Sequence, residues 1–465
     1  MNRIEKRKQR RKTILILLLI AVISIGGIGF QMYRAHRDAQ LEQQKQQQTN
    51  AKKAAESKKA VTEGSESKAA GTEAAKSKSV TKEKNAKDDG LILDSKLSTA
   101  EKVDKLLAEM SIKEKVGQLF MVGFHGTKED QHIKDMISKQ KVGGVILFDR
   151  NMQTPKQVAA LTNRLKQEAD GNDFSLPLLI GLDQEGGPVL RMRDQVSPIP
   201  SQQKLGRTAS PDEVFAVARL NGSELAAMGI GVDFAPVLDL SASDQRSFGR
   251  DAAKTTSYGL QAVKGLNDAN VTASLKHFPG NGRVVVDPHL DESIVKADKA
   301  TLENVDMVPF KRLIEKQAEQ QFFVMVTHVK YPAFDNKLPA SISKTIIQNV
   351  LREKLGYEGI VVTDDLDMGA VSKYYSYEKL GVMAVEAGAD LLLACHEYDH
   401  QLALYQGILT AVKNGKLSEE RIDESVKRIL TYKLDHASNK LVSPEKAATI
   451  VRSPEHLKLI ENIMK

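Results

Sequence analysis

The sequence predicts an α/β fold, a (β/α)₈ TIM-type barrel over residues 96–440, on two observations. First, eight short apolar runs alternate with segments of helix length between residues 117 and 395. Most of these runs are continuously apolar, which is typical of parallel strands that are covered on both faces. Second, polar residues with acid, base or ligand chemistry follow several runs directly, where a barrel places its active site. An open doubly wound sheet is the alternative, but it would usually need fewer strands.

The apolar runs are the expected strands of the barrel, at 117–124, 143–148, 176–183, 231–236, 272–278, 322–328, 359–365 and 389–395. Helices are expected between them, at 153–169, 211–228, 253–269, 300–318, 343–355 and 376–387. Ser210 stands before Pro, Asp and Glu, which is a typical start of a helix. Beyond the barrel, residues 441–465 are expected to form a helical extension.

Two segments before the barrel predict attachment to a membrane. Between positions 2 and 12 there are seven Lys or Arg residues and one Glu. Residues 13–30 carry no charged or amide side chain, and 18 such residues in a helix nearly span a hydrocarbon core of about 30 Å. We therefore expect a transmembrane anchor over 13–32, with residues 1–12 in the cytoplasm because basic flanks stay inside. A secretory signal peptide is the alternative, but no clean cleavage site follows the run.

Residues 33–95 are rich in Ala, Lys, Glu, Gln and Ser and contain few large apolar residues. A segment of this composition cannot bury a core, so it predicts a disordered tether. With a single-pass anchor, the barrel is expected on the outer side of the cell membrane, or released from it by cleavage of the tether.

The charge and the cysteine content exclude several classes of protein. Residues 1–90 hold 20 Lys or Arg against 10 Asp or Glu, whereas the remaining 375 residues hold 47 against 50 and net −3. A nucleic-acid partner is therefore not expected. The single cysteine, Cys395, excludes an intramolecular disulfide and any multi-cysteine metal site. Without an HExxH, P-loop or strand-linked GxGxxG motif, we expect no metal and no cofactor.

Four of the expected strands end in residues whose side chains can act as acid, base, nucleophile or ligand. Asp183, the pair Lys276 and His277, His328 and Asp364 all stand at the C-terminal ends of their apolar runs. Each alone would be an ordinary loop residue or a helix cap. In a barrel, however, these ends meet on one rim, so together they predict a shared site.

The segment 274–293 contains more candidate catalytic residues than any other stretch of similar length. It leaves a strand, turns through Pro and Gly residues, and then presents Asp287 two positions before His289. An Asp so placed can accept an imidazole N–H and orient the ring, and such a His can donate a proton and later take one back. The alternative is an Asp and a His that merely lie on a mobile surface loop.

The segment 360–370 ends a buried strand with Asp364, which is a poor structural position and a good one for a nucleophile. Asp365 or Asp367 is expected to cap the following helix. In the segment 181–194, Asp183 can accept sugar hydroxyls and Arg191 can reach an anionic or carbonyl group, although a sharp turn alone would also explain the glycines there.

These stretches together resemble glycoside hydrolase family 3, in its β-N-acetylglucosaminidase branch. The motifs, which run in the family's order from about 113 to 395, are VGGVILF-R-N, GLDQEGG-V-R, GVDFAPVLDL, RSFG, KHFPG-G, D-H, M-TH and VVTDDLDM. The resemblance implies a single catalytic barrel that hydrolyses terminal non-reducing N-acetyl-β-D-hexosamine residues. Given the expected position outside the membrane, we expect these residues to come from peptidoglycan-derived glycans, and we expect the chain to be a monomer.

By the same resemblance, the reaction retains the anomeric configuration, with a covalent glycosyl-enzyme on Asp364. Asp287 and His289 correspond to the family's proton-handling pair, with His289 as acid and base. The family's sugar-binding positions correspond to Asp183, Arg191, Arg246, Lys276 and His277.

The sequence departs from the family pattern around the implied site. Pro188 replaces an Arg, Asn281 and Arg283 stand in a stretch that is usually Gly-His-Gly-Asp, and Pro288 lies inside the proton-handling pair. Two alternatives follow: a degenerate barrel that binds wall glycans without cleaving them, and an enzyme of the same family that acts like a β-glucosidase.

Overall fold

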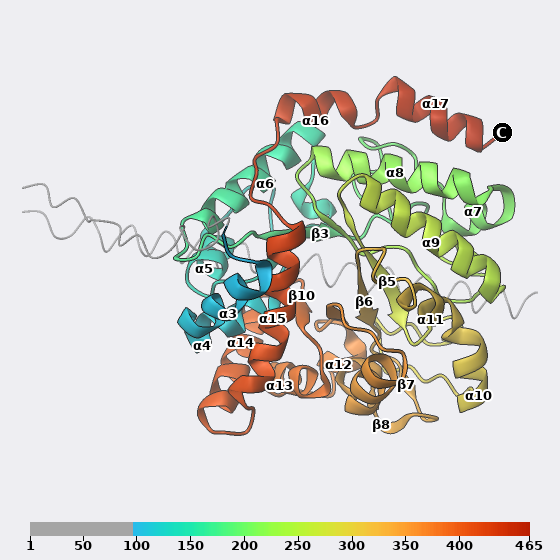
Figure 1. The fold of residues 1–465 in the computed structure, drawn as a ribbon. Coiled ribbons are helices and arrows are strands. Elements are labelled where there is room, and N and C mark those ends of the chain that lie inside the picture. The colour runs from blue at the N-terminus through green and yellow to red at the C-terminus, as the bar shows by residue number, and fades with distance from the viewer. Residues whose placement is uncertain (1–95) are drawn as a thin grey trace, which may run out of the picture. The chain divides into compact units, whose positions relative to one another are not determined.

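A closed barrel of eight parallel strands is the centre of the fold, which the computed structural model describes for residues 96–465 (Figure 1). Around the barrel the strands follow the order β1-β10-β9-β6-β5-β4-β3-β2. Their registers are parallel, with Met121 opposite Gly144 and Val324 opposite Val361, for example. The predicted (β/α)₈ barrel is therefore confirmed, and each of the eight predicted apolar runs contains one of its strands.

The strands of the barrel are β1 (Phe120–Val122), β2 (Gly144–Ile146), β3 (Leu179–Leu182), β4 (Val232–Asp233), β5 (Thr272–Phe278), β6 (Phe322–Val326), β9 (Val361–Asp365) and β10 (Leu391–Ala394). A small antiparallel pair, β7 (Lys330–Tyr331) and β8 (Asp335–Pro339), interrupts the repeat after β6.

The helices are α3 (Thr99–Glu109), α4 (Ile112–Gln118), α5 (Gln131–Ser138), α6 (Pro155–Asp170), α7 (Gln202–Thr208), α8 (Pro211–Ala227), α9 (Ala252–Asp268), α10 (Lys299–Thr301), α11 (Val308–Ile314), α12 (Gly369–Ser372), α13 (Tyr377–Ala387), α14 (Tyr398–Lys413), α15 (Glu419–His436), α16 (Pro444–Ile450) and α17 (Pro454–Ile463). Helix α8 begins as predicted, because the Ser210 hydroxyl accepts the Glu213 N–H while Glu213 accepts the Ser210 N–H.

Two of the predicted helices differ from regular α-helix. Residues Leu302–Asp306 and Thr345–Lys354 are π-helical, and their ends are closed by bonds from Met307 to the Leu302 carbonyl and from Leu355 to the Val350 carbonyl. The periodicity of apolar residues predicts a helix at both places, but it does not distinguish a wider turn from a regular one. Short 3₁₀ turns lie at Asp149–Asn151 and Ala340–Ile342.

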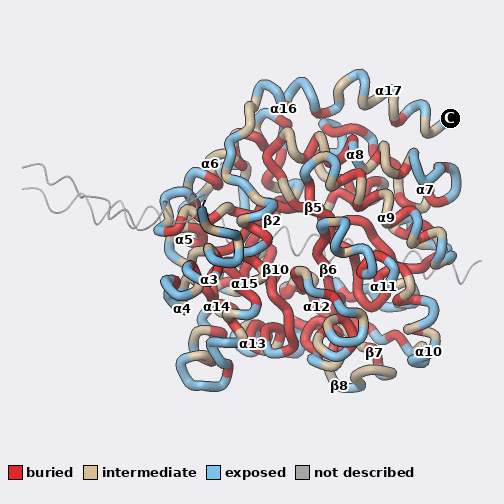
Figure 2. The backbone as a smooth tube through the Cα atoms, viewed as in Figure 1, coloured by how far each residue is buried: buried red, intermediate tan, exposed pale blue. Residues whose placement is uncertain are grey.

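The core consists of the strands and the inner faces of the helices, which are buried together (Figure 2). Every residue of β1, β2, β3, β5, β6 and β10 is buried, which explains why those runs are continuously apolar in the sequence apart from their functional ends. Asp390, just before β10, is also buried and accepts bonds from the Val361 N–H and the Ser425 hydroxyl, so it joins the last two strands to α15.

The last two helices are attached to the barrel by a buried carboxylate. Glu224 on α8 accepts bonds from the Ser197 hydroxyl (2.6 Å), the Arg452 N–H (2.7 Å) and the His456 Nδ1 atom (2.8 Å). Arg452 also donates to the Val196 carbonyl at 2.8 Å. Glu224 therefore links α16 and α17 both to α8 and to the loop that follows β3.

The predicted cytoplasmic segment 1–12, the anchor 13–32 and the tether 33–95 lie outside the described residues and stay predictions. Within residues 96–465, none of the helices combines the length and the apolar composition that crossing a bilayer requires.

Candidate functional site

A cavity of about 250 Å³ lies at the C-terminal ends of the barrel strands. Seven of the eight predicted site residues line it, and they come from β5, β9 and the loops that follow β3, β4 and β5: Asp183, Arg191, Arg246, Lys276, His277, His289 and Asp364. The eighth, Asp287, is bonded to His289. The strand ends that the sequence singles out therefore do meet on one rim.

The floor of the cavity holds a network of alternating charges. The Lys276 ammonium lies 2.7 Å from Asp183 and 2.6 Å from Glu185. Arg246 contacts Glu185 with two nitrogens, Nε at 2.7 Å and Nη2 at 2.8 Å, in a bidentate pair. The network fixes two cations and leaves an outer carboxylate, Asp183, with free acceptor capacity toward the cavity.

Burial would raise the pKa of Glu185, but the fields of Lys276 and Arg246 and their hydrogen bonds outweigh it and lower that pKa to about 2. Burial lowers the pKa of Lys276, but the carboxylates of Asp183 and Glu185 raise it more. The pKa of Lys276 therefore lies above its ordinary value. Glu185 and Lys276 are therefore both charged at neutral pH.

His277 is held in one orientation by Asp239. Its Nδ1–H donates to one Asp239 oxygen at 2.7 Å, and its backbone N–H donates to the other at 3.1 Å. The Nε2 atom accepts from Arg246 at 3.4 Å. Asp239 also accepts the Asn281 N–H at 2.6 Å, so it ties the β5 strand end to the loop that follows.

Arg191 lies on the opposite side of the floor. Its Nη2 atom is 3.3 Å from Asp183 and its Nη1 atom is 3.5 Å from Asp149. The guanidinium also lies over the ring of Phe148, 5.2 Å from the ring centre. The Nε atom of Arg191 is buried without a hydrogen-bond partner, so this side chain keeps a donor at the site.

Asp364 ends β9 at the centre of the cavity. Burial opposes its ionisation, but the neighbouring imidazoles of His277 and His328 and the hydrogen bond from the Asp365 N–H hold the pKa of Asp364 below its ordinary value. The carboxylate is thus an anion at neutral pH. Among residues 96–465, its only hydrogen bond comes from the Asp365 backbone N–H, at 2.9 Å. An ionised, lightly bonded carboxylate at a strand end is suited to nucleophilic attack.

The expectation that Asp365 or Asp367 caps the following helix is wrong. Asp365 accepts the backbone N–H groups of Asp367 and Cys395, and Asp367 accepts the His396 N–H at 3.0 Å. Helix α12 begins after Met368 with no side-chain cap. Both carboxylates instead attach the end of β9 to the end of β10, because the neighbouring strand offers free amides there.

Asp287 and His289 form the predicted pair on the loop after β5. Asp287 Oδ1 accepts from both the Nδ1 atom of His289, at 2.7 Å, and its backbone N–H, at 2.9 Å. Burial would raise the pKa of Asp287, but these two bonds outweigh it and lower that pKa. Since Nδ1–H is engaged by the carboxylate, Nε2 is the ring nitrogen available to a ligand in the cavity.

The loop that carries the pair is attached to the chain just beyond Asp364. The Gly369 and Ala370 N–H groups donate to the carbonyls of His289 and Pro288, both at 3.1 Å. At Gly369 a Cβ atom would come within 2.5 Å of the Leu290 carbonyl oxygen, so this close approach requires glycine. The pair and the carboxylate are therefore joined through backbone contacts as well as by lining one cavity.

The four residues that depart from the family pattern all have structural partners; for Pro188 it is Arg193, which donates to its carbonyl at 3.1 Å. The Asn281 side chain accepts from Tyr331 at 3.1 Å, and Arg283 pairs with Asp306 at 2.7 Å. Pro188 lines the cavity beside Arg191. Pro288 supplies the carbonyl to which Ala370 donates, so the substitutions are accommodated without displacing the charged floor.

Two members of the site, Glu185 and Asp239, are not predicted from the sequence. They stand within the motifs GLDQEGG and GVDFAPVLDL, yet neither follows a strand directly. His328 is predicted to lie on the shared rim, without a role of its own. Its Nε2–H donates to the Asp365 carbonyl at 2.8 Å and its Nδ1 accepts from Ser341 at 2.6 Å, while burial lowers its pKa. His328 therefore supports the end of β9 as a neutral imidazole.

Within residues 96–465, no group of three or more His, Cys, Asp or Glu side chains is arranged to hold a metal ion. The chemistry available at the site comes from its carboxylates, imidazoles and cations.

The comparisons with known proteins agree with this geometry. The family model described as the glycosyl hydrolase family 3 N terminal domain matches residues 111–432. A beta-hexosaminidase from Nitrosomonas eutropha is 34% identical over 320 residues, which cover 66% of this chain and 89% of that protein. Beta-hexosaminidase A from Pseudoalteromonas piscicida is 33% identical over 362 residues, but the match spans only 59% of its length.

Among solved structures, the chain is similar to a glycoside hydrolase family 3 beta-N-acetylglucosaminidase from Paenibacillus sp. The TM-score is 0.70 at 39% sequence identity, and the match covers 76% of this chain and 68% of that one.

Proposed function

Because the chain belongs to glycoside hydrolase family 3 and is therefore a glycosidase, we propose that it releases terminal non-reducing N-acetyl-β-D-hexosamine residues, chiefly N-acetylglucosamine, with retention of configuration. The observation that carries the proposal is that an ionised carboxylate, Asp364, and a carboxylate-bound imidazole, His289, line one cavity with the charged floor around Lys276. The named activities of the similar proteins support the choice of sugar.

In the proposed first step, the Asp364 carboxylate attacks the anomeric carbon and forms an ester bond to the sugar. The bond from that carbon to the glycosidic oxygen breaks, and this oxygen receives the proton of His289 Nε2. Asp287 stabilises the imidazolium before the transfer, because it accepts the Nδ1–H bond.

In the second step, His289 removes a proton from water and the resulting hydroxide attacks the anomeric carbon from the face the aglycone left. The ester bond breaks, Asp364 returns to its ionised form, and the product keeps the β configuration. The lowered pKa of Asp364 supports its role as leaving group as well as nucleophile.

The charged floor supplies the sugar-binding groups in this proposal. Asp183 accepts hydroxyl protons, while Lys276 and Arg246 donate to hydroxyl oxygens from positions that Glu185 fixes. Arg191 and His277 complete the set from either side. Pre-positioned donors of this kind favour a transition state over the free substrate because they need no reorganisation.

We also propose that the natural substrates are peptidoglycan-derived glycans met on the outer side of the membrane. The basic residues within 1–12 and the apolar run 13–30 support this placement. Protease treatment of intact cells whose wall has been removed tests it: the barrel should be digested while cytoplasmic proteins survive. Protection of the barrel would contradict the outer location and leave the chemistry untouched.

The activity is tested with the full chain on aryl N-acetyl-β-D-glucosaminide and aryl β-D-glucoside, beside Asp364→Ala. We expect release of aryl alcohol from the acetamido sugar, a much lower rate with glucoside, and β-anomer as the first product by NMR. A 5-fluoro glycosyl fluoride of the same sugar should leave a mass adduct on the peptide that contains Asp364. Preferred hydrolysis of glucoside would reassign the sugar, and saturable binding without hydrolysis would establish the non-cleaving alternative.

A further inference from the structure

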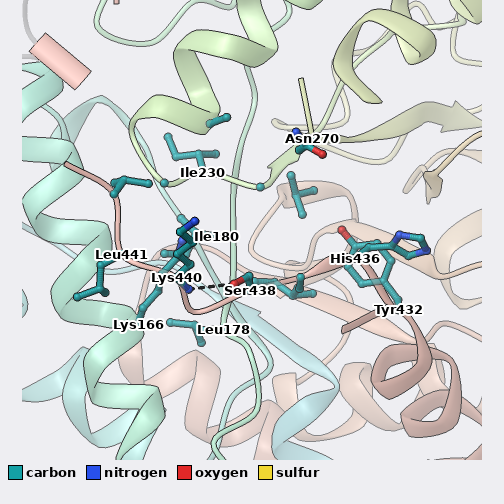
Figure 3. A pocket seen from close by; sticks show the side chains of 17 residues that line it. Lys166, Leu178, Ile180, Ile230, Asn270, Tyr432, His436, Ser438, Lys440 and Leu441 are labelled. Carbon is teal, nitrogen blue, oxygen red and sulfur yellow. Dashed lines mark hydrogen bonds between the residues drawn. The ribbon is translucent and has the colours of Figure 1, made fainter. Parts of the chain in front are cut away.

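A second cavity, of about 420 Å³, lies at the N-terminal ends of β3, β4 and β5, at the opposite end of the barrel from the candidate active site (Figure 3). Its lining includes Leu178 before β3, Ile230 before β4 and Asn270 before β5. The segment 437–442, which leads from α15 to α16, forms its outer wall. It is larger than the cavity of the proposed glycosidase site and shares no residue with it.

The outer wall of this cavity is fixed by side-chain amides. Asn163 on α6 donates to the Val442 carbonyl at 2.8 Å and accepts the Val442 N–H at 2.9 Å. Asn439 accepts the Leu178 N–H at 2.9 Å, so the wall is also attached to the start of β3. The cavity is therefore a built feature of the fold and does not depend on a free loop.

Lys166 on α6 is the notable polar group of the lining. Only 7% of its surface is exposed, yet no hydrogen bond or ion pair joins its ammonium to another described residue. The ammonium of this largely buried side chain therefore has no protein partner for its charge and keeps only part of its hydration, which is unfavourable. Burial lowers the pKa of Lys166, and the nearby Asp170 only partly opposes this.

The rest of the lining indicates what would pair with Lys166. Lys440, His436, Ser438 and Asn270 add hydrogen-bond donors and a second cation, and none of the 17 residues that line the cavity carries a carboxylate (Figure 3). The remaining wall is mostly apolar, with side chains such as Leu178, Ile180, Ile230, Val232 and Leu441. A cavity of this size with apolar walls and a few convergent polar groups is typical of a small-molecule site.

We propose that this cavity binds a small amphiphilic anion, with its carboxylate or phosphate group between Lys166 and Lys440 and its apolar body against Ile180 and Ile230. An anion there supplies the partner that Lys166 lacks, and the ion pair gains strength from burial. The site requires neither a metal nor the sugar chemistry at the other end of the barrel, so it stands independently of the proposed activity.

The probe is octyl phosphate. The uncharged control is 1-octanol, which has the same alkyl chain, and the second control is inorganic phosphate, which has no alkyl chain. Calorimetric titration of the full chain should show saturable binding of octyl phosphate, with at least tenfold weaker binding of both controls. Lys166→Met should weaken octyl phosphate at least tenfold while hydrolysis of aryl glycosides stays unchanged. Lys156→Met, on an exposed position of the same helix, should leave binding intact.

Lys440→Met is the second variant, because Lys440 is exposed and its loss cannot disturb the core. It should weaken octyl phosphate several-fold. Equal binding of octanol and octyl phosphate, or full affinity in both lysine variants, would overturn the proposal. Phosphatidylglycerol vesicles distinguish the source of the anion: retention that depends on Lys166 assigns a membrane lipid, and binding of octyl phosphate alone assigns a soluble amphiphile.

Discussion

The Oε1 atom of Glu185 lies 2.6 Å from the Nζ atom of Lys276, and only 1% and 2% of the two side chains is exposed. Loss of either charge would remove one of the two ion pairs that the other, buried residue makes, since Lys276 also contacts Asp183 and Glu185 also contacts Arg246. Glu185 also holds Arg246 by two bonds, so one carboxylate keeps two cations in place at the floor of the cavity.

Glu185→Gln is therefore expected to damage both folding and binding. Loss of a buried ion-pair partner typically costs about 3–5 kcal/mol, and urea unfolding should show a decrease of that order. In the fraction that stays folded, KM for the aryl substrate should rise more than kcat falls, because the cations lose their position. The exposed Glu319→Gln is the control, and a Glu185→Gln chain with parental KM would contradict the role.

The same carboxylate predicts a pH dependence of stability. The pKa of Glu185 is lowered to about 2 in the folded chain, from an ordinary value of 4.5. The unfolded chain therefore binds more protons between these values, so the stabilisation is complete above pH 4.5 and is lost as the pH falls toward 2. The unfolding free energy of the parent should fall more steeply over this window than that of Glu185→Gln, and parallel curves would refute the assignment.

Asp287→Asn tests the proton-handling pair without removing an acceptor. The amide oxygen can still bond to Nδ1–H, but it no longer stabilises an imidazolium, so kcat should fall by about 10²–10³-fold, within the range of acid–base catalysis. The loss should be smaller for aryl leaving groups that need little protonation. His289→Ala should show the same dependence of kcat on the leaving group. An equal decrease in kcat for all leaving groups would contradict the role of His289 as the acid.

Lys433 on α15 predicts a second pH effect, at the other end of the barrel. Burial lowers its pKa to about 7, and its only hydrogen-bond partner among residues 96–465 is Gln118, at 2.7 Å. The unfolded chain holds more protons on this residue between pH 7 and its ordinary pKa of 10.5, so stability should rise with pH over that window. Urea unfolding at pH 7 and pH 9.5 should show a smaller rise in Lys433→Met than in the parent, while the exposed Lys427→Met follows the parent.

Glu224 predicts that the last two helices stabilise the barrel. Glu224 accepts four hydrogen bonds, which come from Ser197, Arg452 and His456. Removing the charge of Glu224 should lower the free energy of unfolding by about 2 kcal/mol, as is typical of hydrogen bonds to charged groups. Because Arg452 also holds the Val196 carbonyl in the loop after β3, Arg452→Ala should raise KM modestly. Glu461→Gln, on the exposed side of α17, should change neither quantity.

The barrel could be predicted because the burial of each strand leaves its mark in a short, continuous stretch of the sequence. Strands buried on both faces must be continuously apolar, and their polar ends then stand out, as Asp183, Lys276 and Asp364 do. Glu185 could not be found in this way, because its role depends on Lys276 and Arg246, which come from other strands and loops. Asp365 and Asp367 were assigned to a helix cap for the same reason: the competing amides belong to β10, which spacing along the chain does not reveal.

The two backbone bonds from Gly369 and Ala370 to the loop of His289 make these amides reporters of the loop. Their hydrogens exchange with solvent only when the loop separates from the start of α12. Deuterium uptake at these two positions would therefore measure how often His289 leaves its place, and would need neither substrate nor inhibitor. Pro288→Gly would reveal, through exchange of the same two amides, how far the proline holds the loop closed.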